Sequence, residues 1–299
     1  MAGCWLAVLL LVGTGCGVRN VAVNSLADAL AGTGGVFASD DDPELIRDAA
    51  PFSLKLMESV LAETPNHRAL LTATSSSFTQ YAYAFIAQDA DVLETTDIAA
   101  ATVLRTRARK LLLRARDYGL RGLDVAHPGM SRQLIKDPKQ TVCAATKQDV
   151  PLLYWTAAAW GAAITISKND PDLVSDQVIV EALADRALEL DESFDHGAIH
   201  SFLISYEPAR QGAITPAEFR ARKHFQRAVE LSGGQMAAPY VAMAESVSVQ
   251  KQNRAEFETL LKKALAIDAD ARPEWRLANL VMQRRAKWLL SRTSDLFVE

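Results

Sequence analysis

The sequence has few of the residues that interrupt helices. It contains 15 glycines and 11 prolines among 299 residues, and these two residue types disfavour a helix interior more than any others. Alanine and leucine dominate the remaining composition, and this mixture favours long helices over sheets. The sequence therefore predicts an all-α protein.

Cysteine is also scarce, which excludes a scaffold held together by disulfides. Only Cys4, Cys16 and Cys143 occur, and the first two lie in the apolar N-terminal stretch. A chain of this length can bury a sufficient core without disulfide support. Since Cys143 lies between Val142 and Ala144, we expect a small buried side chain without a reactive role.

Positive charge is not in excess. The net charge is -4 at pH 7, which gives nucleic acid no general attraction, so we expect no nucleic-acid partner. A basic run extends from Arg105 to Arg116, but Ala108, Leu112 and Ala115 interrupt it at helical spacing. We interpret the run as the solvated face of a helix, with binding of an anion or an acidic partner as the alternative.

Motifs of catalysis are missing. The sequence contains no glycine-rich phosphate loop, no nucleophile elbow and no grouping of Ser, His and Asp that stands out, so we expect no enzyme and no cofactor. His196 and His200 are four residues apart and are expected to share a helix face. They lack the glutamate of zinc proteases and a third ligand at helical spacing. We interpret them as hydrogen-bonded residues between helices, and a zinc-dependent enzyme remains an alternative.

The N-terminus has the pattern of an export signal. Residues 1–18 carry no charge and end in small residues around Cys16, as is typical of a signal peptide over residues 1–15. The Gly-Thr-Gly-Cys sequence resembles a bacterial lipobox, which predicts that Cys16 is lipidated and tethers the chain to a membrane. A transmembrane anchor is the alternative, although the stretch is shorter than the roughly 20 residues that a spanning helix needs.

Two further segments follow this leader. Residues 16–42 contain a glycine-rich stretch and three consecutive aspartates, and we expect a weakly structured linker. Asp42 and Pro43 are a helix N-cap and a first helical residue, so a single helical-repeat domain is predicted over 43–299. Inside it, the stretch 121–150 is long and polar, and a connection of this kind is usually functional or mobile.

A repeat indicates how the helices pack. Small or apolar residues recur with the spacing i, i+4, i+7 in four triads. The triads are Ala108, Leu112 and Ala115; Val180, Ala184 and Ala187; Ala221, Phe225 and Ala228; and Phe257, Leu261 and Ala264. A period of about 36 residues, doubled at the first step, is typical of helix-pair solenoids. We predict tetratricopeptide-like helical hairpins, about ten helices in all, with cap helices over 44–63 and 274–291. An ordinary helical bundle is the alternative.

Aromatic residues gather at two places in the chain. Tyrosine and tryptophan on facing helices can line an amphipathic cavity, because each ring has an apolar face and a polar tip. The candidates for such a ligand cavity are Tyr81, Tyr83, Phe85, Tyr154, Trp155, Trp160 and His200. Packing of these rings in the core is the alternative.

The chain resembles the TatT family, the T component associated with TRAP transporters. The resemblance rests on segments in a fixed order over most of the mature chain. These are 51–55 (PFSLK) with Glu58, Pro65, His67, Leu70 and Leu71; 81–85 (YAYAF); 114–121 (RARDYGLR); 153–155 (LYW) with Trp160; 196–200; 225–234; 277–279 with Gln283, Ala286, Leu289 and Leu290; and 295–297.

This resemblance implies an accessory lipoprotein of a solute import system, without catalytic or metal-binding residues. It implies a homotrimer that binds a periplasmic solute-binding protein and holds a small hydrophobic or organic-acid ligand in an internal cavity or pore. The expected location is the periplasm, and the outer membrane is favoured because Gly17 rather than aspartate follows Cys16. A scaffold of an outer-membrane assembly complex is the alternative.

Overall fold

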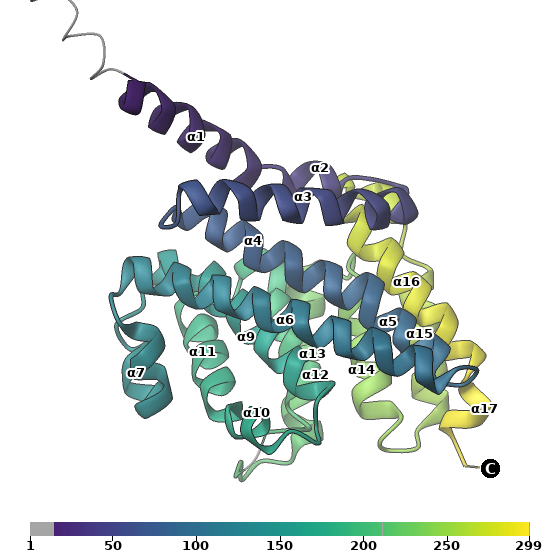
Figure 1. Cartoon of the computed structure of the whole chain (residues 1–299). Coiled ribbons are helices and arrows are strands. Elements are labelled where there is room, and N and C mark those ends of the chain that lie inside the picture. The colour runs from purple at the N-terminus through teal and green to yellow at the C-terminus, as the bar shows by residue number, and fades with distance from the viewer. Residues whose placement is uncertain (1–14, 211, 299) are drawn as a thin grey trace, which may run out of the picture.

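The structure is a computed structural model that describes residues 15–210 and 212–298, and all regular structure in these ranges is helical (Figure 1). The all-α class predicted from composition is confirmed. The helices of the first half are α1 Gly15–Ala31, α2 Gly34–Ala38, α3 Pro43–Glu63, α4 Arg68–Tyr81, α5 Gln88–Leu93, α6 Ile98–Ala126, α7 Met130–Lys136 and α8 Pro138–Val142. Those of the second half are α9 Val150–Thr165, α10 Pro171–Ser175, α11 Gln177–Leu190, α12 Ala198–Tyr206, α13 Ala217–Leu231, α14 Ala238–Met243, α15 Arg254–Leu265, α16 Arg276–Ser291 and α17 Thr293–Leu296.

The helices predicted at the four triads and the cap helices predicted over 44–63 and 274–291 all correspond to helices of the structure. The four triads lie on their buried faces: Ala108, Ala115, Val180, Ala187, Ala221, Ala228, Phe257 and Ala264 are all fully enclosed. Because alanine has the smallest side chain that a helix favours, neighbouring helices approach closely along these faces. The closer likeness to tetratricopeptide repeats stays a prediction.

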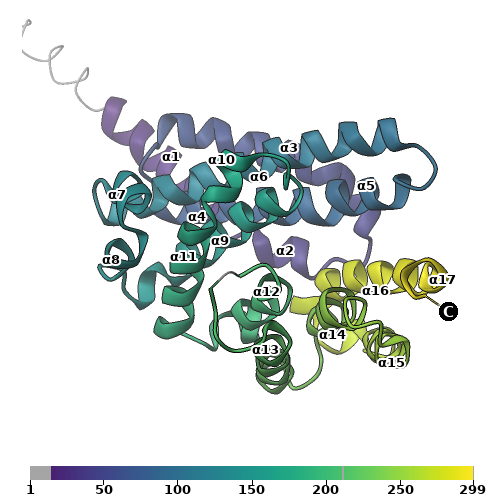
Figure 2. The same ribbon diagram turned by 90° about the horizontal axis from the view of Figure 1, so that it is seen from below.

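The helices form two groups that meet along α16 and along α12, whose Ile199, Leu203 and Tyr206 pack in the core of α9 and α11. Helices α3 to α6, with α9 and α11, make one group, and α12 to α16 form a row beside it (Figure 2). The second group has its own apolar core around Val241, Phe257 and Leu261. Val281 of α16 belongs instead to the core of α3, α4 and α6. Helix α16 therefore joins the two groups.

The basic run of α6 is a solvated face, as predicted. Ala108, Leu112 and Ala115 are buried, while the arginines between them bind carboxylates of neighbouring segments. Arg105 contacts Glu94 at 2.6 Å, and Arg109 pairs with Asp170. Such exposed pairs contribute little stability each, so the run needs no partner to explain it.

The N-terminal linker prediction was wrong for most of its length. Residues 16–42 contain α1 and α2, and Ala27 and Leu30 of α1 are buried against Met57, Val60 and Leu61 of α3. The physical reason is that no proline occurs in this segment and that its glycines, apart from Gly17, lie close together at positions 32, 34 and 35. The predicted signal peptide, apart from Gly15, lies outside the described residues.

Two smaller predictions also need correction. The connection 121–150 is ordered, because α6 extends to Ala126 and the short helices α7 and α8 follow. Its last residues are fixed by the buried carboxylate of Asp149, which binds Arg68 and lies 3.0 Å from the Nε2 of His127. Cys143 is exposed rather than buried, since it follows the last turn of the five-residue helix α8.

Candidate functional site

Two helices of the structure contain a π-helical turn. The first, η1 Ala82–Ala87, joins α4 to α5, and the second, η4 Ala244–Ser248, follows α14. In each turn an N–H bonds to the carbonyl five residues earlier, as Gln88 does to Tyr83 and Val249 to Ala244. Such turns are rare and occur often at functional sites.

One arginine of α16 connects the two π-helical turns. The Arg285 side chain is 8% exposed and lies 2.9 Å from a carboxylate oxygen of Asp91, just after η1. It also binds both oxygens of Glu245 in η4. Burial disfavours the guanidinium charge, but Glu245 and Asp91 outweigh it and raise the pKa of Arg285. The cluster thus holds a charged side chain in the junction between the two helix groups.

Tyr83 of η1 lies beside this cluster. Burial, and then the charge of Glu245, raises the pKa of its phenol to about 12, although 42% of the residue is reached by solvent. Tyr83 is therefore more exposed than Tyr81 and Phe85, the other aromatic residues of its segment.

A hollow of about 280 Å³ adjoins the cluster between α3, α5 and α16. Its lining residues are Arg47, Gln88, Asp89, Val92, Arg284, Arg285 and Trp288. The ring of Trp288 lies 4.2 Å from the Arg285 guanidinium. The volume is close to the lower end of the range of small-molecule sites.

The π-helical turn η1 also positions two arginines of this hollow. The carbonyl of Ala84 accepts a hydrogen bond from Arg284, and that of Phe85 accepts one from Arg47 at 3.5 Å. The two guanidinium groups lie 5.6 and 5.2 Å from the centre of the Phe85 ring. Since α-helical carbonyls are normally satisfied within their own helix, these contacts depend on the local irregularity of the backbone.

The sequence candidates of the first aromatic segment separate into two environments. Tyr81 and Phe85 are buried at 7% and 3% exposure, with ring centres 5.8 Å apart. Their packing in the core of α3, α4 and α6 accounts for them. Tyr83 is the member of this group that faces water, because it lies on the other side of the helix.

The residues of the second aromatic segment also lie in two environments, two of them partly exposed and one buried. Tyr154 and Trp155 are partly exposed neighbours with ring centres 4.8 Å apart. Burial, and then the charge of Asp195, raises the pKa of the Tyr154 phenol. Trp160 is buried in the core, where Arg116 covers its ring at 4.8 Å and its N–H donates to Asp176 at 3.2 Å.

The comparison with known proteins identifies the relatives of this chain. A family model described as "TRAP transporter T-component" matches residues 39–297. The chain belongs to this family. A protein of Treponema pallidum (strain Nichols), described as uncharacterized, is 27% identical over 317 residues, which cover 99% of this chain and 97% of that protein. Membership points to a non-enzymatic accessory role in a TRAP transport system.

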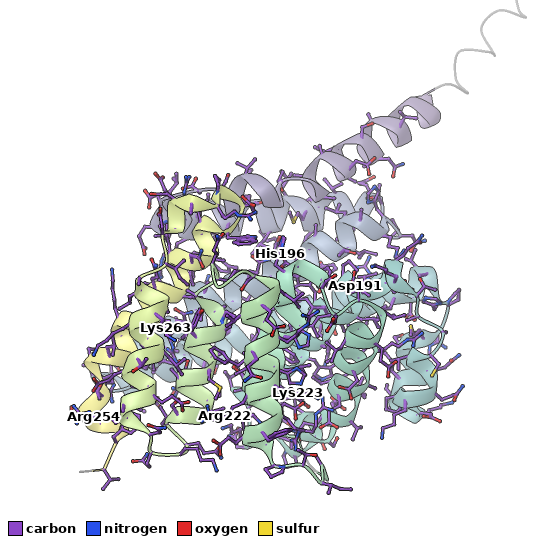
Figure 3. All side chains as sticks on the ribbon, turned by 180° about the vertical axis from the view of Figure 1, so that it is seen from behind. Asp191, His196, Arg222, Lys223, Arg254 and Lys263 are labelled. Atoms are coloured by element: carbon purple, nitrogen blue, oxygen red, sulfur yellow. The ribbon has the colours of Figure 1, made fainter. Side chains whose placement is uncertain are left out.

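The histidines of this T-component do not form the pair expected from their spacing. His196 has a left-handed backbone (φ 53°) in the turn before α12, and its ring contacts Trp275 with centres 4.7 Å apart (Figure 3). Only His200 lies in α12, so the two do not share a helix face. Among the described residues no group of three His, Cys, Asp or Glu side chains could hold a metal ion.

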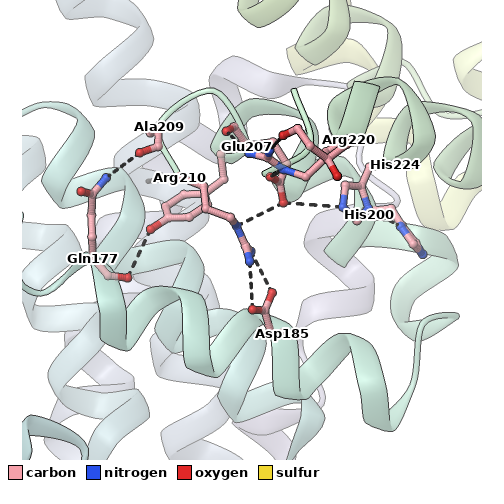
Figure 4. A network of polar contacts seen from close by, with 10 residues as sticks. Gln177, Asp185, His200, Glu207, Ala209, Arg210, Arg220 and His224 are labelled. Atoms are coloured by element: carbon pink, nitrogen blue, oxygen red, sulfur yellow. Dashed lines mark hydrogen bonds and ion pairs between the residues drawn. The ribbon is translucent and has the colours of Figure 1, made fainter. Parts of the chain in front are cut away.

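His200 instead contacts a histidine that the sequence analysis did not single out. Its Nδ1 lies 2.8 Å from the Nδ1 of His224 on α13 (Figure 4). The Nε2 of His224 lies 3.7 Å from the buried carboxylate of Glu207, which also binds Arg210 and Arg220. The network ties the end of α12 to the start of α13, and its burial explains His200 without a ligand.

Sequence reasoning missed the arginines of the hollow. Arg284 and Arg285 are adjacent on α16, where a charged pair normally indicates the solvated face. The sequence did indicate that the pair lies near the core. Apolar residues stand on both sides of it, at Met282 and Ala286, and both are buried. Because the face of α16 next to the pair is buried, at least one of the two arginines must contact protein.

The N-terminus of the T-component contains an apolar helical stretch. Residues Val21–Ala38 have a mean hydropathy of 1.2 over 18 residues, enough by length and composition to cross a membrane. Its middle packs on the folded domain through Ala27 and Leu30. Such a stretch fits a membrane-associated or periplasmic protein. Cys16 falls in the first turn of α1.

Proposed function

We propose that this T-component is an accessory lipoprotein of a TRAP-type solute import system. It binds a periplasmic solute-binding protein and holds a small hydrophobic or organic-acid ligand in an internal cavity or pore. The observation that carries the proposal is the family match over residues 39–297. The protein performs no catalysis in this role.

Exposed aromatic side chains support the ligand part of the proposal. Tyr83 is 42% exposed, and the partly exposed Tyr154 and Trp155 offer further aromatic surface. Aromatic rings with polar tips are suited to small organic molecules. We assign the ligand-facing role to these three residues rather than to Tyr81, Phe85, Trp160 and His200, whose packing accounts for them.

Exposed apolar side chains support the partner part of the proposal. Leu45 and Phe52 of α3 are 56% and 75% exposed, and Val36 of α2 is 74% exposed. Leu45 and Phe52 are seven residues apart and share a face of α3, and neighbouring exposed apolar side chains are typical of contact with other proteins. The proposed assembly is a homotrimer that docks the solute-binding protein.

Lipidation of Cys16 would tether this assembly to the membrane. Helix α1 begins at Gly15, so the proposed acyl chains would be attached at the start of a helix that leaves the domain. Gly17 supports the periplasmic face of the outer membrane as the location.

The partner is tested by direct binding to the purified solute-binding protein whose gene neighbours that of this chain. We expect a complex that elutes as one species in size-exclusion chromatography, with a matched solute-binding protein from an unrelated transporter as the negative control. Equal elution with and without the cognate protein would refute the docking. Copurification with outer-membrane assembly proteins instead would support the scaffold alternative.

Native mass spectrometry of the protein isolated from membranes tests the remaining parts together. The expected spectrum has three subunits, each carrying acyl chains on Cys16. A chain without acyl mass would remove the anchor, and a monomer or dimer would remove the trimer. Neither result would affect the docking experiment.

A further inference from the structure

The arginines of the hollow between α3, α5 and α16 differ in how well their charges are neutralised. Arg47 binds both oxygens of Asp89 and lies 2.8 Å from Glu44. Arg285 binds both oxygens of Glu245 and lies 2.9 Å from Asp91. Each of these two therefore faces two carboxylates and has little capacity for another anion.

Arg284 is the exception. Its only carboxylate contact among the described residues is a 3.4 Å approach to Glu44, whose other oxygen is closer to Arg47. Its second contact is the uncharged Ala84 carbonyl. A guanidinium has five N–H donors, so the Nε–H and one N–H on each terminal nitrogen of Arg284 have no protein acceptor. The side chain is 35% exposed, and solvent in the hollow can reach it.

A neighbouring positive charge adds to this imbalance. Arg47 and Arg284 lie over the same Phe85 ring. Burial, and then the repulsion from Arg47, lowers the pKa of Arg284. An anion placed against Arg284 would relieve that repulsion and occupy the unused donors.

The rest of the hollow defines the other part of the ligand. Trp288 and Val92 contribute apolar surface to the wall, and the Trp288 ring is held in place by Arg285. A planar carboxylate matches the guanidinium fork with two parallel hydrogen bonds. A doubly charged phosphate fits poorly, because Asp89, Glu44, Asp91 and Glu245 surround a single under-neutralised cation.

We propose that this hollow binds a small monocarboxylate with an apolar or aromatic body, and that Arg284 is the residue that holds its carboxylate. The apolar body lies against Trp288 and Val92. The inference rests on the proposed binding of a small ligand, and it concerns a hollow that Tyr83, Tyr154 and Trp155 do not line.

The test is a titration of the purified chain with benzoate, followed by isothermal calorimetry and by saturation-transfer NMR, with no solute-binding protein present. Benzamide, which has the same shape without the charge, and inorganic phosphate are the matched probes. We expect benzoate to bind and both other probes to bind at least tenfold more weakly, since charge-assisted hydrogen bonds give this difference.

Two variants of Arg284 and one control locate the site. Arg284→Gln is expected to weaken benzoate binding by tenfold to a hundredfold, and Arg284→Lys less, because it keeps the charge and loses the fork. Arg292→Gln is the control: Arg292 lies 5.8 Å from the Trp288 ring, pairs with Asp295 at 2.6 Å and does not line the hollow. Its affinity for benzoate should equal that of the parent protein.

Three outcomes would overturn the proposal. They are equal affinity for benzoate and benzamide, unchanged affinity in both Arg284 variants, and no binding up to about 10 mM benzoate, which corresponds to a negligible free energy for a specific site. Thermal unfolding of each variant verifies that it is folded, and Arg284→Lys serves if Arg284→Gln is not. Since the titration contains no partner protein, its failure would leave the proposed docking untouched.

Discussion

Gly119 in the middle of α6 shows how closely the helices of the first group approach. A Cβ at this position would lie 2.1 Å from the Oγ1 of Thr156 and 3.1 Å from the Oγ of Ser75. Both side chains are fully buried on the neighbouring helices α9 and α4. Only glycine allows α6 to pass between them at this separation.

Gly119→Ala is therefore expected to destabilise the protein. Relief of the overlap requires Thr156 or its helix to move, and overpacking of this kind costs about 1–3 kcal/mol in the free energy of unfolding. Urea unfolding followed by circular dichroism measures the change. Gly35→Ala in α2 is the matched control, because nothing lies within 4 Å of its Cβ position and alanine favours helices. Equal losses in both variants would contradict the packing argument.

The contact between His200 and His224 requires a defined arrangement of protons. One Nδ1 must donate and the other accept across their 2.8 Å separation. The Nε2 of His224 faces the buried Glu207, so it carries a proton and its Nδ1 is the acceptor. In the neutral ring His200 then donates through Nδ1, and its Nε2 has no hydrogen-bond partner within normal distance. Glu192, 3.5 Å away, and Arg227 are the charged groups nearest to it.

Stability should consequently fall at acidic pH. Burial, and then the charge of His224, lowers the pKa of His200 to about 4 from its ordinary 6.5. The unfolded chain binds a proton in this range before the folded chain does, so the stabilising contribution is complete above pH 6.5 and is lost as the pH falls toward 4. Its size is on the order of 2 kcal/mol after allowance for solvent screening.

Thermal unfolding between pH 4 and pH 8 measures this dependence. We expect a smaller fall in Tm for His200→Gln than for the parent chain. His196→Asn is the control, since asparagine tolerates the left-handed backbone at that position and the residue is exposed. A profile of His200→Gln that parallels the parent would show that other groups control the acid response.

At the scale of the element, the start of α3 was predictable from residue types alone. The Asp42 carboxylate accepts hydrogen bonds from the N–H groups of Glu44 and Leu45, both at 3.0 Å, and Pro43 is the first helical residue. Helix ends of this kind are local, because the cap and its donors are within three residues of each other.

Asp42→Ala tests the cap. The loss of both hydrogen bonds should reduce the free energy of unfolding by about 1 kcal/mol. Asp41→Ala is the matched control, because Asp41 is exposed and one residue outside the helix; it should change the stability by less than about 0.5 kcal/mol. Chemical denaturation of the two variants in parallel gives the comparison, and equal effects would rule out the cap as the cause.

Other elements could not be predicted because they depend on distant contacts. Each triad of small residues forms a buried helix face, since periodicity is written into the sequence itself. The π-helical turn at Ala82–Ala87 has no such local signal, and its carbonyls are satisfied by Arg47 and Arg284, which are far away in the sequence. For the same reason Tyr83 could not be separated from Tyr81 and Phe85, because one extra residue in a turn changes which side chain faces water.

At the scale of the whole molecule, the two helix groups are held together by polar as well as apolar contacts. Arg285 of α16 binds Asp91 from the first group and Glu245 from the second. A buried charge with two partners strongly disfavours any separation that leaves it unpaired. The hollow therefore lies at a junction whose geometry is fixed by the same residues that line it.

The N-terminal helix belongs to this folded unit, and a pair of truncations tests that conclusion. Removal of residues 1–38 would expose Met57, Val60 and Leu61, which α1 covers through Ala27 and Leu30. It would also remove the contact of Asp28 with His67 at 3.2 Å. From the apolar surface exposed, we expect a loss of roughly 2–5 kcal/mol in the free energy of unfolding.

Removal of residues 1–20 is the matched control, because it keeps Ala27 and Leu30 and should leave the stability within about 0.5 kcal/mol of the mature chain. Urea unfolding of the two truncated chains, both without a lipid, isolates the packing contribution from any effect of the membrane. If the two truncated chains are equally stable, α1 lies on the domain without stabilising it. The folded unit then begins at Pro43, as the sequence predicted. If only the longer truncation is destabilised, a tether at Cys16 would hold the domain at the membrane through a helix that is part of its core.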